Sequence, residues 1–214
     1  MIRIALLASG SGTNVQAILD AHAQGKIQAE IVGVIVNVPG AAVIQRAHAA
    51  GVRCVVIPHR DYGSRAEFEQ AMAQVLTQWQ IDLIVLAGFM RILSAEFVQR
   101  FSGQMINIHP SLLPAYKGLH THDRVLATGD RLHGCSIHFV TPDLDAGAVI
   151  AQSVLTVAPH ESSQQLAARV NVLELQLYPR IVSWISAGRI VFLGNKPYLD
   201  GKELLTPVRF WNHG

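Results

Sequence analysis

The chain has 214 residues, half of which are hydrophobic, so it is long enough to bury one large core. Charged residues make up only 15% of the chain and the formal net charge is +2, which argues against a nucleic-acid-binding face. Cys54 and Cys135 have no metal-binding or redox spacing and no apolar run is long enough to span a membrane, so we expect one cytoplasmic domain over residues 1–214.

Apolar segments of strand length alternate with helical patterns through the first half of the chain. The expected strands cover residues 2–8, 31–37, 53–58, 81–87 and 105–109. Continuously apolar strands separated by helices indicate a parallel sheet that is covered on both faces. Ser64 and Glu67 match a capping box that opens a helix ending near Trp79, and Gly25 and Gly51 lie where two other helices should end.

The second half of the chain follows a different pattern. After a loop we expect, in order, a short helix over residues 123–128, strands over residues 136–140 and 149–157, and a long amphipathic helix over residues 162–186. Asp200-Gly201 then indicates a hairpin. The sequence therefore predicts an α/β fold, with a mostly parallel sheet, helices on both faces and a C-terminal antiparallel portion.

A glycine-rich turn, Ser9-Gly10-Ser11-Gly12-Thr13-Asn14, joins the first strand to the first helix. Backbone N–H groups and the helix dipole favour an anion at such a turn, and a phosphate fits. A dinucleotide fingerprint needs a third glycine where Val15 stands and an acidic residue where Asn37 ends the second strand, so NAD is disfavoured. The alternative is an unoccupied tight turn.

Two polar side chains lie in the fifth expected strand, Met105–His109. Side chains alternate along a strand, so Asn107 and His109 face the same space, with Cα atoms roughly 6.6 Å apart. An amide donor beside a histidine that can carry a proton suits stabilisation of an oxyanion at a carbonyl carbon. An exposed loop carries Asp145, our candidate for the carboxylate that orients His109. Alternatively, Asn107 caps a turn and His109 is a hydrogen-bonded histidine at the rim of the sheet.

The segment Leu86-Ala87-Gly88-Phe89-Met90-Arg91-Ile92-Leu93 ends the fourth expected strand. Open parallel sheets bind ligands beyond the carboxyl ends of their strands, which places this segment beside His109. Met90, Ile92 and Leu93 offer an apolar slot for a flat heterocycle, although packing against the next helix would look similar.

Two other chemistries are disfavoured. His120-Thr121-His122 has the closest spacing among the ten histidines, but two histidines do not complete a metal site and no cysteine cluster accompanies them. A serine hydrolase would need a Gly-x-Ser-x-Gly elbow, which the sequence lacks. We therefore expect no bound metal.

Together these motifs resemble the phosphoribosylglycinamide formyltransferase family of folate-dependent formyltransferases, over nearly the whole chain. The motifs are residues 9–14, residues 87–93, Asn107-Ile108-His109-Pro110-Ser111-Leu112-Leu113-Pro114 and Asp143-Leu144-Asp145. The resemblance implies a Rossmann-like formyltransferase fold. It implies transfer of the formyl group of 10-formyltetrahydrofolate to the amine of 5-phosphoribosylglycinamide, in de novo purine (IMP) biosynthesis. The folate is then a cosubstrate, and no bound cofactor is implied.

The resemblance also implies roles for individual residues. Asn107, His109 and Asp145 would be catalytic, and Glu174 would contact the amine end of the ribonucleotide. The N-terminal half, about residues 1–100, would bind the substrate phosphate through Ser11, Gly12, Thr13 and Asn14. The catalytic and folate-binding half would be about residues 101–214. Folate contacts are implied for Arg65, Met90, Arg91, Ile92, Leu93, Asn107, Thr141, Pro142, Asp143, Leu144 and Asp145.

The sequence departs from the family pattern at two places. Ala146 and Ala148 stand where the family has glycine and proline, and alanine tolerates positive φ poorly, which bears on the loop conformation. Leu173 and Leu175 flank Glu174, where polar neighbours are usual. Two alternative functions are a 10-formyltetrahydrofolate hydrolase and a non-catalytic phosphate-ligand binding module. We expect a monomer or a weak homodimer.

Overall fold

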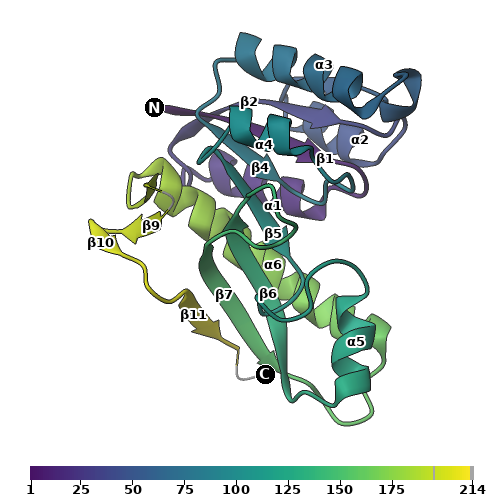
Figure 1. Ribbon diagram of the computed structural model, residues 1–214, viewed down its shortest axis with the longest axis vertical. Helices are drawn as coiled ribbons and strands as arrows, with labels where there is room; N and C mark the ends of the chain where they lie inside the picture. The colour runs from purple at the N-terminus through teal and green to yellow at the C-terminus, as the bar shows by residue number, and fades with distance from the viewer. Residues whose placement is uncertain (195, 213–214) are drawn as a thin grey trace.

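An eight-stranded sheet runs through the whole molecule, as the computed structural model in Figure 1 shows; the structure describes residues 1–194 and 196–212. The strand order is β11-β7-β6-β5-β4-β1-β2-β3. These strands are β1 (Ile2–Ala8), β2 (Ala29–Val36), β3 (Cys54–Val56), β4 (Leu83–Leu86), β5 (Met105–His109), β6 (Leu132–Phe139), β7 (Val149–Thr156) and β11 (Val208–Trp211). β1 to β5 pair in parallel, whereas β6 is antiparallel to both β5 and β7. The predicted mostly parallel sheet with a C-terminal antiparallel portion is confirmed.

Helices cover both faces of this sheet (Figure 1). They are α1 (Thr13–Ala23), α2 (Val43–Ala49), α3 (Arg65–Gln78), α4 (Ala95–Arg100), α5 (Thr121–Thr128) and α6 (Ser163–Ser186). Adjacent residues of β1 point to opposite faces, so Leu6 packs in one core with α1, α2 and α6, and Leu7 packs in a second core with α3 and α4. Among the described residues, no helix is long and apolar enough to cross a membrane.

Local signals explain most helix ends. The Ser64 side chain accepts a hydrogen bond from Glu67 N, and Ser162 forms a capping box with Gln165, so α3 and α6 begin where the sequence predicts. Gly25 and Gly51, which follow α1 and α2, have φ of 71° and 68°, a left-handed conformation that glycine adopts without strain.

Pairing across the sheet changes other boundaries. The strand that we expect over residues 136–140 is β6, which begins earlier, at Leu132. Its antiparallel partner β7 continues to Thr156, and Leu132 pairs with that residue. The predicted Asp200-Gly201 hairpin is present between β9 (Lys196–Leu199) and β10 (Lys202–Glu203). With β8 (Ile190–Leu193) these strands form a small second sheet, seen in yellow-green and yellow in Figure 1. Neither β8 nor β11 is anticipated from the sequence.

Tyr178 fastens α6 to the centre of the sheet. Its side chain is fully buried, and its hydroxyl donates a hydrogen bond to Leu86 O in β4 at 2.8 Å. Burial raises the pKa of this hydroxyl well above its ordinary value, so it stays a donor.

Replacing Tyr178 by phenylalanine should lower the free energy of unfolding by roughly 1–2 kcal/mol, because the buried Leu86 carbonyl loses its donor. Urea unfolding followed by circular dichroism measures this difference. Tyr198→Phe in β9, a half-buried position outside the main sheet, is the matched control and should change stability much less. Equal unfolding midpoints for Tyr178→Phe and the parent would contradict the prediction.

Candidate functional site

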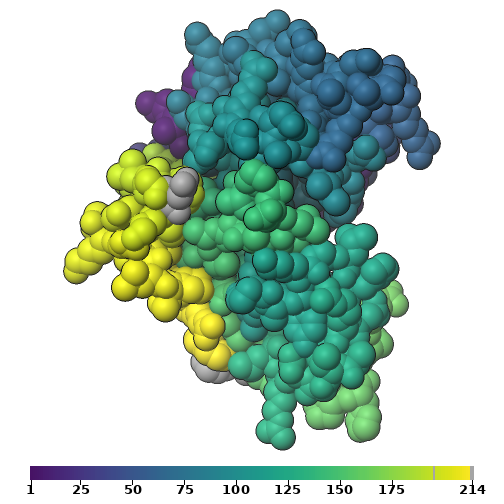
Figure 2. All heavy atoms as spheres, viewed as in Figure 1, coloured from purple at the N-terminus to yellow at the C-terminus, as the bar shows by residue number. Residues whose placement is uncertain are grey.

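Several irregular segments meet at the carboxyl ends of β1, β4 and β5. Ser9 N donates to Gly88 O at 3.0 Å, so the turn after β1 lies directly against the segment after β4. Asn107 and His109 lie in β5 beside them, since β5 pairs with β4. In Figure 2 the green surface that includes the loop after β6 lies between the blue N-terminal half and the teal residues around 110–130. Open parallel sheets bind ligands at this edge.

His109 makes contacts through both of its ring nitrogens. Its Nε2 lies 2.9 Å from Tyr116 O, and a carbonyl oxygen can only accept, so Nε2 carries a proton. Its Nδ1 lies 3.4 Å from Asp145 Oδ2. A ring with its single proton on Nε2 would turn the lone pair of Nδ1 toward this carboxylate. An imidazolium would present one N–H to Tyr116 O and the other to Asp145 Oδ2. The contact with Asp145 is a hydrogen bond only when Nδ1 carries a proton as well.

The carboxylate of Asp145 is fixed by a second set of contacts. Gly118 N donates to its Oδ2 at 2.9 Å, and its Oδ1 lies 3.6 Å from His138 Nε2. Asp145 itself has φ of 47°, a left-handed conformation that aspartate adopts more readily than most residues. The side chain is only 9% exposed, so the carboxylate is largely buried between the two histidines.

The alanines that depart from the family pattern do not take the strained position. Positive φ falls on Asp145, and neither Ala146 nor Ala148 adopts it. Gly147 is the restrictive residue, because a Cβ there would lie 1.8 Å from Phe139 O. The loop thus needs glycine at 147 for close approach to β6, and alanine is tolerated on either side.

His138 is a member of this cluster that the sequence interpretation missed. Its Nδ1 lies 2.9 Å from Phe139 O and therefore carries the proton, so its Nε2 accepts from Asn107 Nδ2 at 3.2 Å. Burial lowers the pKa of His138, opposed by its hydrogen bond to Phe139 and by Asp145, which fits a neutral ring. One N–H of the Asn107 side-chain amide thus donates to His138, and the other can donate to a ligand.

A signal for His138 is present in the sequence but needs the strand register. Ser136 and His138 are polar residues two positions apart in β6, so they lie on one face of the strand. The antiparallel register places His138 opposite Asn107 and Ser136 opposite His109. Only this pairing shows that the polar face of β6 meets that of β5.

A buried polar network holds the loop that supplies Tyr116 O and Gly118 N. Ser136 Oγ donates to Ser111 O at 2.7 Å and accepts from Leu113 N at 3.0 Å. Gln152 Nε2 donates to Leu113 O at 2.8 Å. Because these groups are buried and satisfied, the loop is fixed before any ligand arrives.

The glycine-rich turn is shaped by its contacts with α2. Gly12 has φ of 72°, and a Cβ there would meet Val43 Cγ2 at 2.5 Å, so only glycine fits. Arg46, which the sequence interpretation did not single out, donates its Nε to Ser11 O at 2.7 Å and brings a positive charge to the turn. The first amides of α1, from Thr13 onward, complete an anion-attracting surface.

The side-chain amide of Asn14 donates to a carboxylate, so it is not free to donate to a phosphate. Its Nδ2 donates to Glu174 Oε2 at 3.1 Å, and Asn171 Nδ2 donates to the same oxygen at 3.2 Å. Burial raises the pKa of Glu174, and these two donors oppose the shift. Asn14 Oδ1 is buried and has no hydrogen-bond partner among the described residues. The Glu174 carboxylate and Asn14 Oδ1 are thus neighbouring hydrogen-bond acceptors. Leu173 is buried in the core and does not displace Glu174.

The segment after β4 presents its apolar side chains unevenly. Met90 and Ile92 are 72% and 64% exposed, whereas Leu93 is buried. The predicted apolar slot is therefore an exposed edge with one buried member. Leu144, in the loop after β6, is also half exposed.

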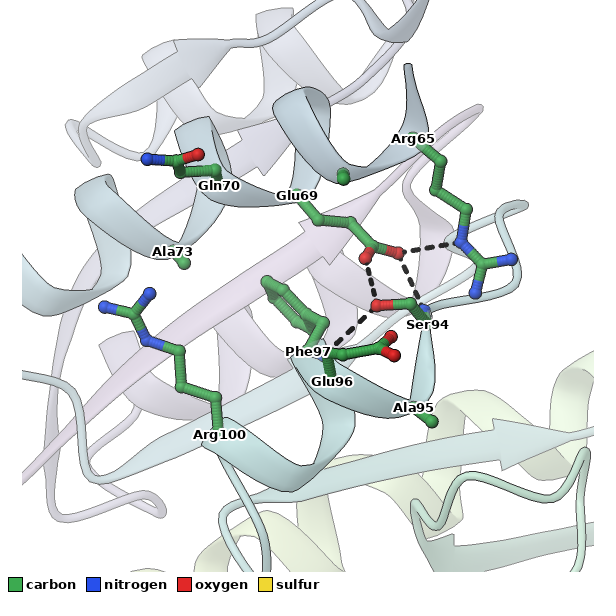
Figure 3. Close-up of a pocket in the computed structure, with 10 residues that line it drawn as sticks. Arg65, Glu69, Gln70, Ala73, Ser94, Ala95, Glu96, Phe97 and Arg100 are labelled. Carbon is green, nitrogen blue, oxygen red and sulfur yellow. Dashed lines mark hydrogen bonds and ion pairs between the residues drawn. The ribbon is translucent and has the colours of Figure 1, made fainter.

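Arg65 lies at the start of α3, within contacts separate from the histidine cluster. Its Nε lies 3.1 Å from Glu69 Oε1, and both residues line a cavity of about 540 Å³ between α3 and α4. Figure 3 shows the two terminal nitrogens of the guanidinium directed away from Glu69.

His120 and His122, the two histidines with the closest spacing, have different partners in the fold. His120 faces Asp123 at 3.7 Å, whereas His122 Nδ1 lies 3.0 Å from His133 Nε2. Within residues 1–194 and 196–212, no group of three or more His, Cys, Asp or Glu side chains could hold a metal ion.

Comparisons with known proteins point to one family. A family model described as formyl transferase matches residues 2–182. The phosphoribosylglycinamide formyltransferase of Haemophilus influenzae is 42% identical over 204 residues, which cover 95% of this chain and 96% of that protein. The trifunctional purine biosynthetic protein adenosine-3 of Homo sapiens is 41% identical over 188 residues, which cover 88% of this chain and 19% of that protein.

A solved structure agrees with the sequence comparisons. The phosphoribosylglycinamide formyltransferase of Coxiella burnetii matches with a TM-score of 0.93 at 45% sequence identity, over 98% of this chain and 99% of that one. Near-complete coverage of both chains means that the fold is similar throughout.

The hydrogen-bond pattern predicts the tautomer of His138. Its ring should be neutral at pH 7, with the proton on Nδ1, and should stay neutral at a lower pH than a free histidine peptide does, because burial lowers its pKa. As the pH falls below about 6.5, the unfolded chain then gains a proton that the folded chain does not, so this residue lowers stability in acid. Long-range ¹H–¹⁵N NMR identifies the tautomer, and a proton on Nε2 at pH 7 would contradict the assignment.

Proposed function

The chain belongs to the formyl transferase family, and we propose that it transfers the formyl group of 10-formyltetrahydrofolate to the amine of 5-phosphoribosylglycinamide in purine biosynthesis. Relatives that match most of the chain at 41–42% identity are named for this reaction or for purine biosynthesis. The observation that carries the proposal is the His109–Asp145 pair beside Asn107, at the sheet edge that also bears the glycine-rich turn.

The histidine cluster suits the charge that develops in this reaction. The substrate amine attacks the formyl carbon, and the carbonyl electron pair moves to oxygen. The free N–H of Asn107 donates to that oxyanion, while the imidazolium form of His109, with Asp145 facing its Nδ1, stabilises it electrostatically. The bond from the formyl carbon to the folate nitrogen then breaks as a proton passes from the amine to that nitrogen. Holding both substrates in attack geometry supplies a further part of the rate.

The ribonucleotide fits the turn and its surroundings. The phosphate binds the backbone amides of residues 12–14, with Ser11 and Thr13 as side-chain donors and Arg46 nearby. Asn14 contributes its backbone amide, since its side chain is engaged with Glu174. Glu174 Oε1, the carboxylate oxygen that neither asparagine contacts, and Asn14 Oδ1 are acceptors, so they suit the N–H and O–H donors of the ribosylglycinamide.

The folate lies on the other side of the cluster. Its ring contacts the edge formed by Met90, Arg91, Ile92 and Leu93 and the loop over residues 141–145, where Leu144 adds apolar surface. Arg65 pairs with the glutamate carboxylates of the tail. The N-terminal half thus binds the phosphate, and the C-terminal half supplies catalysis and most of the folate site, within one domain.

The composition of the chain bears on its partners and on its cellular compartment. The folate acts as a cosubstrate and both ligands are small molecules, and the low net charge suits the absence of a nucleic-acid partner. Cys54 and Cys135 are free thiols, in keeping with a reducing cytoplasm. We expect a monomer or a weak homodimer.

Incubating the purified protein with 10-formyltetrahydrofolate, with and without 5-phosphoribosylglycinamide, separates three functions. A transferase should release tetrahydrofolate only when the amine is present, and formylated ribonucleotide should appear in equal amount. Release without the amine would indicate a hydrolase. Binding of both ligands with no release would indicate a non-catalytic binding module.

Substitutions in the two subsites should separate the two Michaelis constants. Asn14→Ala removes a donor to Glu174 and should raise the KM for the ribonucleotide about tenfold while leaving the folate KM within about twofold. Arg65→Ala should do the reverse, with little change in kcat. Steady-state kinetics with each substrate varied in turn measures both. Parallel rises in both constants for either variant would indicate a general defect instead.

A further inference from the structure

The folate edge after β4 has no regular secondary structure, yet both of its ends are tied down. Residues 87–94 lie between β4 and α4, outside any helix or strand. Met90 N donates to Ser9 Oγ at 2.8 Å, and Ser94 N donates to Glu69 Oε1 at 2.7 Å. The exposed side chains of Met90 and Ile92 project from the stretch between these two anchors.

The first anchor is a hydroxyl whose direction is fixed. Ser9 Oγ donates to Asn37 Oδ1 at 2.6 Å, so its lone pairs are free to accept from Met90 N. Ser9 is 8% and Asn37 1% exposed. Asn37 stands where a dinucleotide-binding protein would carry an acidic residue for ribose. Here its carboxamide is turned inward and orients Ser9 instead.

The second anchor is a buried carboxylate that serves two binding elements at once. Glu69 is 5% exposed and accepts hydrogen bonds from Ser94 N, Ser94 Oγ and Arg65 Nε. Figure 3 shows it between Arg65 on α3 and Ser94 at the start of α4. A buried carboxylate needs several donors, and these three come from both parts of the proposed folate site.

Each contact of Glu69 fixes a different part of the site. Its bond to Arg65 Nε restrains the guanidinium and leaves the two terminal nitrogens directed outward (Figure 3). Its bonds to Ser94 hold the end of the folate edge, and Ser94 Oγ in turn caps α4 by accepting from Phe97 N at 3.1 Å. Restraining both elements before binding lowers the entropy lost when the ligand binds.

We propose that Ser9 and Glu69 are positioning residues for the folate: Ser9 holds the Met90 end of the edge, and Glu69 holds the Ser94 end together with Arg65. This inference rests on the proposed function, because it takes residues 90–93 and Arg65 as folate contacts. Neither residue needs to touch the ligand. Both act through the geometry of groups that do.

The principal test is Glu69→Gln, which keeps the side-chain size and one acceptor but removes the charge and the second acceptor. The KM for 10-formyltetrahydrofolate should rise about tenfold, with kcat and the ribonucleotide KM within about twofold of the parent. Glu96→Gln, an exposed carboxylate on the same cavity, is the matched control and should leave all three constants unchanged. Ser9→Ala should also raise the folate KM, and Ser9→Thr, which keeps the hydroxyl, should restore part of it.

A double-mutant cycle separates positioning from mere stabilisation. If Glu69 acts through Arg65, Glu69→Gln should raise the folate KM less in an Arg65→Ala background than in the parent. A fall in melting temperature for Glu69→Gln and Ser9→Ala with an unchanged folate KM would overturn the proposal, since it would assign both residues a purely structural role. If instead the parent protein binds no folate and Arg65→Ala has no effect, the proposed function itself fails.

Discussion

The structure of the site depends on one largely buried carboxylate. Asp145 lies between two histidines, and the donors that face its carboxylate gather on Oδ2. Gly118 N supplies one donor directly. His109 supplies another when it is charged, and its remaining N–H is taken by Tyr116 O. The loop over residues 110–120, the left-handed turn at Asp145 and the orientation of the His109 ring are therefore one coupled arrangement.

The second histidine, His138, is held by a different set of contacts. His138 donates from Nδ1 to a carbonyl of its own strand, which leaves Nε2 as an acceptor for Asn107. It therefore fits its pocket as a neutral ring, and burial favours that form. The two imidazoles thus lie on either side of Asp145 with different hydrogen-bond patterns. In the proposed reaction, His109 stabilises the oxyanion and His138 orients the amide of Asn107.

Rigid elements outside the site hold its irregular parts. The loop over residues 110–120 is fixed by Ser136 and Gln152, whereas the segment after β4 is fixed by Ser9 and Glu69. These anchors are buried side chains on or next to strands and helices. Functional loops can thus be exposed at their tips, as at Met90 and Ile92, and still keep a defined backbone.

Features that depend on neighbouring residues could be predicted from the sequence. Apolar runs located β1 to β7, Ser64 and Ser162 located two helix starts, and alternation along β5 placed Asn107 and His109 on one face. The partners of those residues depend on the assembled fold and could not be predicted in this way. The β5–β6 register brought His138 to Asn107, and packing of α1 on α6 turned Asn14 to Glu174. Periodicity and capping act over a few positions, whereas these contacts join residues 31 and 160 positions apart, which only the completed sheet and its covering helices bring together.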